Sequence, residues 1–172
     1  EKVIIPEIKN PNLEEFLKKD QKVKFIWLGH SSLLMNTNSK IILIDPVFSP
    51  SASPVSFVLK RFQKPVLNLK GLPPVDIILI SHDHYDHLDH KVAEFYRKKK
   101  STLFVVPTGV ENHLMKWGIE NDRVKTLGWW SSQKVSDLNF ICTPAQHFSG
   151  RRKLYENKTL WCSWVIQSDD AN

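Results

Sequence analysis

Imidazole and carboxylate side chains crowd into residues 80–90, ISHDHYDHLDH, which hold four of the seven histidines in this 172-residue chain. In extended backbone, side chains two residues apart point to the same side, so His82 and His84 can approach one cation together. If the chain then bends into a helix, Asp86 and His87 turn towards a second point a few ångströms away. Imidazole and carboxylate ligands suit zinc, and also iron or manganese. The stretch therefore predicts a metal site.

A solvated polar turn, followed by an aspartate that caps a helix, is the alternative interpretation of the same residues. We favour the metal site because the cluster directly follows an apolar run, PVDIILI, and α/β proteins carry their sites at the ends of such buried strands. The remaining polar residues of this kind are expected to be structural: Asp89 as a helix N-cap, Asp83 as a contact to site groups, and His90 and His113 on helix faces.

The elements that must position the cluster follow from apolar periodicity and turn residues. Val23, Phe25 and Trp27 alternate with lysines, which is typical of a strand with one buried face. Helices are predicted after Asn12, over 90–100 and over 108–118. Strands are predicted at about 22–28, 32–36, 40–45, 102–107, 124–128, 138–143 and 160–166, and in PVDIILISH. This order predicts a mixed α/β (α+β) layered fold, with residues 1–172 as one domain.

Composition narrows the class of protein. The net charge of +6 permits an acidic partner, but the basic runs Arg97–Lys100 and Arg151–Lys153 are interpreted as solvated surface, and no nucleic-acid motif is present. No run of about 18 apolar residues occurs. Two cysteines without a disulfide pattern predict reduced thiols and a cytoplasmic location. The sequence starts without Met. We therefore keep open the interpretation that an upstream anchor was removed and that the protein associates with a membrane.

The motif His-x-His-x-Asp-His after an apolar strand resembles the signature of the metallo-β-lactamase fold, an αββα sandwich that usually holds two metals, most often zinc. Further segments resemble the branch that contains N-acylphosphatidylethanolamine-hydrolysing phospholipase D and, more distantly, ascorbate-6-phosphate lactonases. These segments are WLGHSS, ILIDPVFSPSASP, KWGI, TLGWW, TPAQHFSGR and LWCSWVI. The likeness covers about residues 22–166.

The resemblance implies a role for each matching residue. His82, His84 and His147 would bind the first metal, while Asp86 and His87 would begin the second site and take part in catalysis. Asp45, at the end of IILID, would orient a ligating imidazole by accepting its other N–H. His30 of WLGHSS would lie near the substrate. A zinc ion lowers the pKa of water to about 7, so hydrolysis would need no side-chain nucleophile.

The resemblance also implies residues that this sequence does not show. The family continues with a bridging aspartate and a final histidine, whereas no histidine follows His147 and Asp169 and Asp170 stand in a different context. We therefore expect the N-terminal part of a zinc-dependent phosphodiesterase acting on a lipid or small-molecule substrate. Its second sheet would be largely missing, its activity low, and self-association or peripheral membrane contact possible. The alternatives are a sugar-phosphate lactonase, a nuclease, or a metal-binding fragment without activity.

Overall fold

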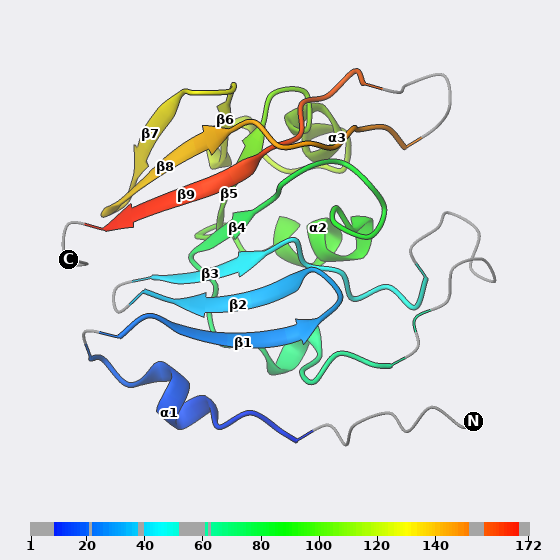
Figure 1. Ribbon diagram of the computed structural model, residues 1–172. Helices are drawn as coiled ribbons and strands as arrows, with labels where there is room; N and C mark the ends of the chain where they lie inside the picture. The colour runs from blue at the N-terminus through cyan, green and yellow to red at the C-terminus, as the bar shows by residue number, and fades with distance from the viewer. Residues whose placement is uncertain are drawn as a thin grey trace.

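The computed structural model describes residues 9–20, 22–37, 40–51, 61, 63–151 and 157–168, which form two β-sheets and flanking helices (Figure 1). The first sheet has the order β1-β2-β3-β4-β5-β6 and the second has the order β7-β8-β9. Their bounds are β1 Lys24–Gly29, β2 Ser32–Asn36, β3 Ile41–Ile44, β4 Ile77–Leu79, β5 Leu103–Pro107, β6 Val124–Leu127, β7 Ser132–Val135, β8 Leu138–Thr143 and β9 Ser163–Ser168. Asp169 and Asp170 lie outside the described residues.

Short helices begin where the sequence supplies caps. The Asn12 side chain accepts a hydrogen bond from the backbone N–H of Glu15, and Asp89 accepts one from Lys91 N–H, as the sequence predicts. The α-helices are α1 Leu13–Leu17, α2 His90–Arg97 and α3 Glu111–Lys116, and the 3-10 turns are η1 Leu69–Gly71 and η2 Asn121–Arg123. Among these residues no helix has the length and apolar character needed to cross a bilayer.

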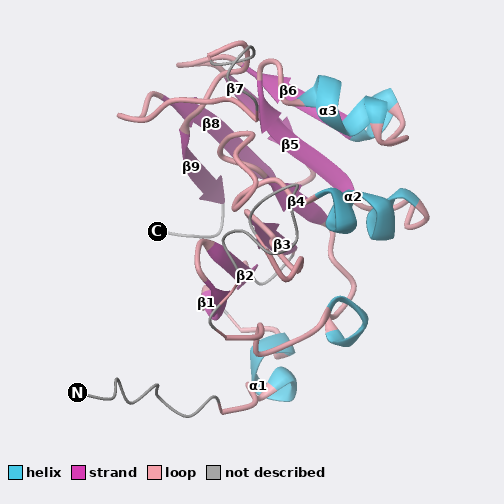
Figure 2. Ribbon diagram, turned by 90° about the vertical axis from the view of Figure 1, so that its right-hand side faces the viewer, coloured by secondary structure: helices cyan, strands magenta, loops and turns pink. Residues whose placement is uncertain are grey.

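The layers are helix, sheet, sheet (Figure 2). Helices α2 and α3 cover one face of the six-stranded sheet, where Leu34, Leu43, Ile78 and Phe104 are buried with the apolar side of α2. The other face packs on the second sheet around Ile42, Ile77, Leu79, Val105, Leu138 and Phe140. The mixed α/β prediction is confirmed. The second sheet is present as three strands, more than the sequence led us to expect.

Two details of the strand prediction were wrong. β1 forms, but its buried side chains are Ile26 and Leu28, while Phe25 and Trp27 are 57% and 65% exposed. Both faces of this strand are apolar, so alternation alone could not select the face that meets the helical layer. β7 was missed because three of its four residues are polar and exposed.

Strand direction gathers the site at one edge. β1 and β3 are each antiparallel to β2, and β3, β4 and β5 are parallel, so β1, β3 and β4 end at the same edge of the sheet. The turn with His30, the residue Asp45 and the loop 81–89 follow these three ends.

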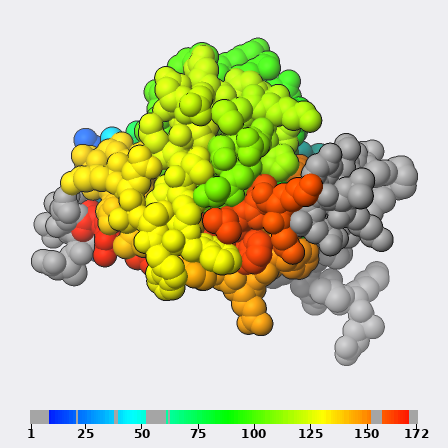
Figure 3. Space-filling model, turned by 90° about the horizontal axis from the view of Figure 1, so that it is seen from above, coloured from blue at the N-terminus to red at the C-terminus, as the bar shows by residue number. Residues whose placement is uncertain are grey.

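A close backbone contact joins the two layers near this edge. Leu160 N–H donates to the Thr108 carbonyl at 2.7 Å, and the segment around residue 160 lies against the one around residue 110 (Figure 3). Gly109 has a φ of +94°, and a Cβ there would lie 2.8 Å from Thr159 Cα. Only glycine fits this position without a shift of backbone.

Candidate metal centre

The loop between β4 and α2 is fixed by its own backbone. His87 N–H and Leu88 N–H both donate to the His84 carbonyl, at 3.1 and 2.8 Å, which turns the chain between the two halves of the motif. At the end of the loop, the Asp89 carboxylate also accepts hydrogen bonds from Phe48 N–H and Ser49 N–H. The loop is therefore anchored to the segment after β3 before α2 begins.

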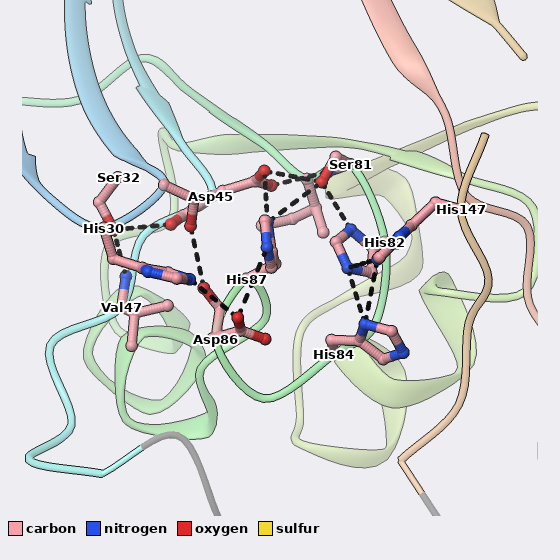
Figure 4. A network of polar contacts seen from close by, with 12 residues as sticks. His30, Ser32, Asp45, Val47, Ser81, His82, His84, Asp86, His87 and His147 are labelled. Carbon is pink, nitrogen blue, oxygen red and sulfur yellow. Dashed lines mark hydrogen bonds and ion pairs between the residues drawn. The ribbon is translucent and has the colours of Figure 1, made fainter. Parts of the chain in front are cut away.

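Three histidines meet at the inner end of this loop (Figure 4). His82 Nε2 lies 3.0 Å from His84 Nδ1 and 3.0 Å from His147 Nε2, and the latter lies 3.3 Å from His84 Nδ1. His147 arrives from the segment after β8, although it is 65 residues from His82. The structure thus brings together the three residues that the resemblance assigned to the first metal.

The chemistry of this triangle fits a cation. A neutral imidazole nitrogen is either a donor or an acceptor, so three nitrogens in mutual contact include at least one pair of the same kind. A metal ion between them resolves the conflict, because each nitrogen can turn a lone pair to it. Two imidazole nitrogens on a tetrahedral zinc with Zn–N distances of about 2.0–2.1 Å lie about 3.3 Å apart, close to the observed separations.

Asp45 stands behind both halves of the motif. Its carboxylate accepts hydrogen bonds from Ser81 N–H and Ser81 Oγ, each at 2.7 Å, and lies 2.9 Å from His87 Nδ1. Ser81 Oγ also lies 2.8 Å from His82 Nδ1. With Nδ1 of His87 donating to Asp45, its Nε2 is left with a lone pair, the arrangement expected of a carboxylate that orients a ligand. The sequence did not point to Ser81.

A second group of possible ligands, beside the three histidines, consists of His30, Asp86 and His87. His30 Nε2 lies 2.8 Å from Asp86 Oδ2, and His87 Nε2 lies 3.8 Å from the same oxygen. One ligand atom from each of the three residues falls within 4.8 Å of the others. His30, expected near the substrate, thus contacts the residues expected to begin the second metal site.

Electrostatics separate the two groups. Burial lowers the pKa of His82 to about 3, assisted by His87 and the other histidines, and burial together with His147 lowers the pKa of His84. Burial also lowers the pKa of His87, but the hydrogen bond and charge of Asp45 outweigh it, so the net shift is upward. His82 and His84 are therefore neutral at physiological pH and have lone pairs to offer.

A cavity of about 250 Å³ opens beside the clusters. It is lined by Ser81, His82, His87, Ala145, His147, Trp161 and Cys162. Its lining combines imidazole rings with apolar side chains, which suits a polar reacting group attached to an apolar body.

Comparison with known proteins agrees with this geometry. The family model of the β-lactamase superfamily domain matches residues 40–172. The chain belongs to this superfamily. Igni18, a metallo hydrolase from Ignicoccus hospitalis, has the same fold as this superfamily member, with a TM-score of 0.61 and 21% identity over 86% of this chain and 56% of that one. The expected metallo-β-lactamase fold is confirmed, and its helix, sheet and sheet layers lie in the described residues.

Two relatives have a higher sequence identity to this chain than Igni18 has. An uncharacterised protein of Mycobacterium tuberculosis is 44% identical over 141 residues, which are 81% of this chain and 38% of that protein. The mitochondrial N-acyl-phosphatidylethanolamine-hydrolysing phospholipase D of Saccharomyces cerevisiae is 38% identical over 144 residues, which are 81% of this chain and 30% of that enzyme. The chain thus spans less than half the length of both relatives.

Proposed function

We propose that this chain carries the metal-binding part of a zinc-dependent phosphodiesterase that acts on N-acyl phosphatidylethanolamine or a similar lipid. The convergence of the His82, His84 and His147 ring nitrogens within 3.0–3.3 Å is the observation that supports metal binding most strongly. The yeast phospholipase D, 38% identical over the matched residues, supports the substrate class.

The chain's own residues would divide the work. His82, His84 and His147 would hold the first ion, and Asp86 and His87 would face the second, with Asp45 keeping the His87 ring oriented. When bound, a divalent ion supplies Lewis acidity and lowers the pKa of water to about 7. Three nitrogen ligands with an open fourth position match catalytic zinc sites, and iron or manganese would suit the same donors.

Exposed aromatic side chains beside the clusters support a lipid substrate. The Phe148 ring is 56% exposed and lies 4.7 Å from the His84 ring, centroid to centroid. Trp27 is 65% exposed and donates its indole N–H to the His30 carbonyl at 2.8 Å. Apolar surface of this kind next to a polar site would contact acyl chains, and could bring the protein to a membrane surface.

The test measures metal content first and turnover second. We expect the purified chain to retain zinc, and to add water across the phosphodiester bond so that phosphatidic acid and the N-acylethanolamine separate. The rate is expected to be low, because Asp86 and His87, with the half-exposed His30 beside them, would bind a second ion weakly. His84→Ala should lose the metal and the turnover, whereas His90→Ala, a matched change on α2 outside both clusters, should keep them.

Two results would argue against the proposal. A folded chain that binds no divalent ion would refute the metal site. Turnover that persists in His84→Ala, or in the presence of a chelator, would refute metal-dependent hydrolysis even if metal is found.

A further inference from the structure

Arg151 lies against the loop 81–89, which we call the metal loop, although the sequence analysis interpreted this residue as part of a solvated basic run. Its Nη1 donates to the carbonyls of Asp83 and Leu88 at 2.8 and 2.7 Å. The guanidinium carbon lies 3.9 Å from the centroid of the Tyr85 ring and 5.2 Å from that of Trp117. Two carbonyls and two aromatic rings therefore hold this cation in the curve of the loop, and the solvated interpretation was wrong for Arg151.

Asp83 completes the connection from the other side. Its carboxylate is 2% exposed. One oxygen accepts a hydrogen bond from Gly150 N–H at 2.7 Å, and the other lies 3.2 Å from His113 Nε2 on α3. We call the contacts of Asp83 with Gly150 and of Arg151 with the loop the Asp83–Arg151 clasp.

The clasp joins the two segments that supply the three-histidine cluster. His82 and His84 flank Asp83 directly, and His147 precedes Arg151 by four residues. The segment carrying His147 thus has three polar ties to the loop, of 2.7, 2.7 and 2.8 Å, within a few residues of its ligand. Ligands on separate segments bind a metal more tightly when their spacing is fixed in advance, because less ordering then opposes binding.

We propose that the Asp83–Arg151 clasp is a positioning device, which holds His147 at ligand distance from His82 and His84 before any ion arrives and so sets the affinity of the three-histidine cluster. This inference rests on the proposed function, since it assumes that the cluster holds a metal. The hydrogen bonds of Arg151 go to backbone carbonyls and not to the rings of His82, His84 or His147. Arg151 therefore acts by fixing the backbone of the loop.

The chain offers a matched comparison in Arg123. This side chain also donates to backbone carbonyls, those of Tyr96, Lys99 and Thr102 at 2.8–3.0 Å, and its guanidinium carbon lies 5.7 Å from the Phe104 ring centroid. Its contacts join the end of α2 to the start of β5, away from the metal loop. Both arginines should stabilise the fold, but only Arg151 should control the affinity for metal.

The experiment compares Arg151→Met with Arg123→Met in the full 172-residue chain. Zn²⁺ affinity is measured by competition with a chromophoric chelator, and the thermal midpoint is measured without metal. We expect both variants to have a lower thermal midpoint than the wild type. Arg151→Met should also weaken Zn²⁺ binding by about 10-fold or more, the size of effect seen when supporting contacts of ligands are lost, and should alter the absorption spectrum of bound Co²⁺. Arg123→Met should change neither metal readout.

Two further variants keep the test decisive if a methionine variant does not fold. Arg151→Lys keeps the charge but cannot reproduce the planar guanidinium, so its affinity should fall between wild type and Arg151→Met. Asp83→Asn should weaken Zn²⁺ binding through loss of one acceptor. Wild-type affinity and an unchanged Co²⁺ spectrum in Arg151→Met, or an equal loss of affinity in Arg123→Met, would overturn the clasp. A wild-type chain that binds no Zn²⁺ would overturn the proposed function and this inference with it.

Discussion

The two clusters of possible metal ligands at this sheet edge are held in different ways. The three-histidine cluster combines a loop and a segment 65 residues away, and His82 within it is 4% exposed. The cluster of His30, Asp86 and His87 has its inner member fixed by Asp45, but the side chains of His30 and Asp86 are 55% and 37% exposed. The three-histidine cluster is therefore joined by contacts between two segments, although its His147 is exposed, and the other cluster is open to solvent at His30 and Asp86.

This difference predicts unequal affinity. The ring nitrogens of His82, His84 and His147 already lie 3.0–3.3 Å apart, whereas the exposed side chains of His30 and Asp86 must be ordered when an ion binds, and that ordering opposes binding. Asp86 and His87 are adjacent in the chain, yet we predict that their cluster binds the more weakly, so proximity in sequence does not set the order of affinity. A metal titration of the chain should show one tight and one weak event.

The largest expected effect comes from removing His147, the member of the three-histidine cluster that is distant in the sequence. His147→Ala should abolish the tight event, with a loss greater than the roughly 10–100-fold caused by changing an outer partner of a ligand. The weak event should remain, because His30, Asp86 and His87 are untouched. Isothermal titration with Zn²⁺ distinguishes the two events. If His147→Ala lost only the weak event, the assignment of the two clusters would be reversed.

A smaller effect is expected when Asp45 loses its charge. Asp45→Asn should weaken the weak event about 10–100-fold, since His87 loses the carboxylate that orients it. Asp45 has a φ of +40°, a conformation that asparagine tolerates well, so the backbone should stay in place.

Asp76→Asn is the matched control for this change. The Asp76 carboxylate accepts the Ile41 N–H at 2.8 Å, at the opposite end of the strands. It should alter stability without altering either binding event. Equal metal affinities in Asp45→Asn and wild type would show that Asp45 does not support the ligand.

His30 gives a sharper test of the outer cluster. If His30 only forms an exposed pair with Asp86, His30→Asn should weaken the second event by no more than about fivefold, the equivalent of about 1 kcal/mol. Asparagine again suits the left-handed backbone, where His30 has a φ of +49°. A loss of 100-fold or more in the same titration would instead make His30 a metal ligand, and the two clusters would differ less in affinity than we predict.

The sequence was informative where chemistry lies in neighbouring residues. The strand before His82, the bend after it and the cap at Asp89 follow from apolar runs and turn residues, and all three are observed. The proximity of His147 and Asp45 to the loop came from the resemblance, since a 65-residue separation has no signature of its own. The ligand roles themselves stay predictions.

The features that the sequence did not predict depend on contacts between distant segments. β7 is polar and is held by its pairing with β8 and by the burial of Val135. Arg151 reads as solvated because basic residues follow it, and only the fold places the Tyr85 and Trp117 rings around it. The exposed face of β1 was mistaken because both of its faces are apolar. The local sequence pattern cannot decide which of two apolar faces, or which basic side chain, becomes buried, because tertiary packing decides this.

The smallest expected effect is a pH dependence of opposite sign in the two clusters. Burial lowers the pKa of His82 to about 3, whereas the hydrogen bond and charge of Asp45 raise the pKa of His87 against the effect of burial. In the unfolded chain both should titrate near about 6.5. His82 therefore contributes stability above that pH that is lost as the pH falls towards 3. His87 contributes stability at lower pH that is lost as the pH rises through its raised pKa.

Metal-free chain, denatured by urea between pH 4 and 8, should reveal both slopes. Each changes the free energy of unfolding by at most about 1.4 kcal/mol per pH unit, and the lowered pKa of His84 adds to the acid-side fall. His82→Asn should flatten the acid-side fall relative to wild type. His87→Asn should lose more stability at acid pH than at alkaline pH. If both variants shifted the profile in the same direction, burial would dominate in both clusters, and the orienting role of Asp45 would be too weak to distinguish them.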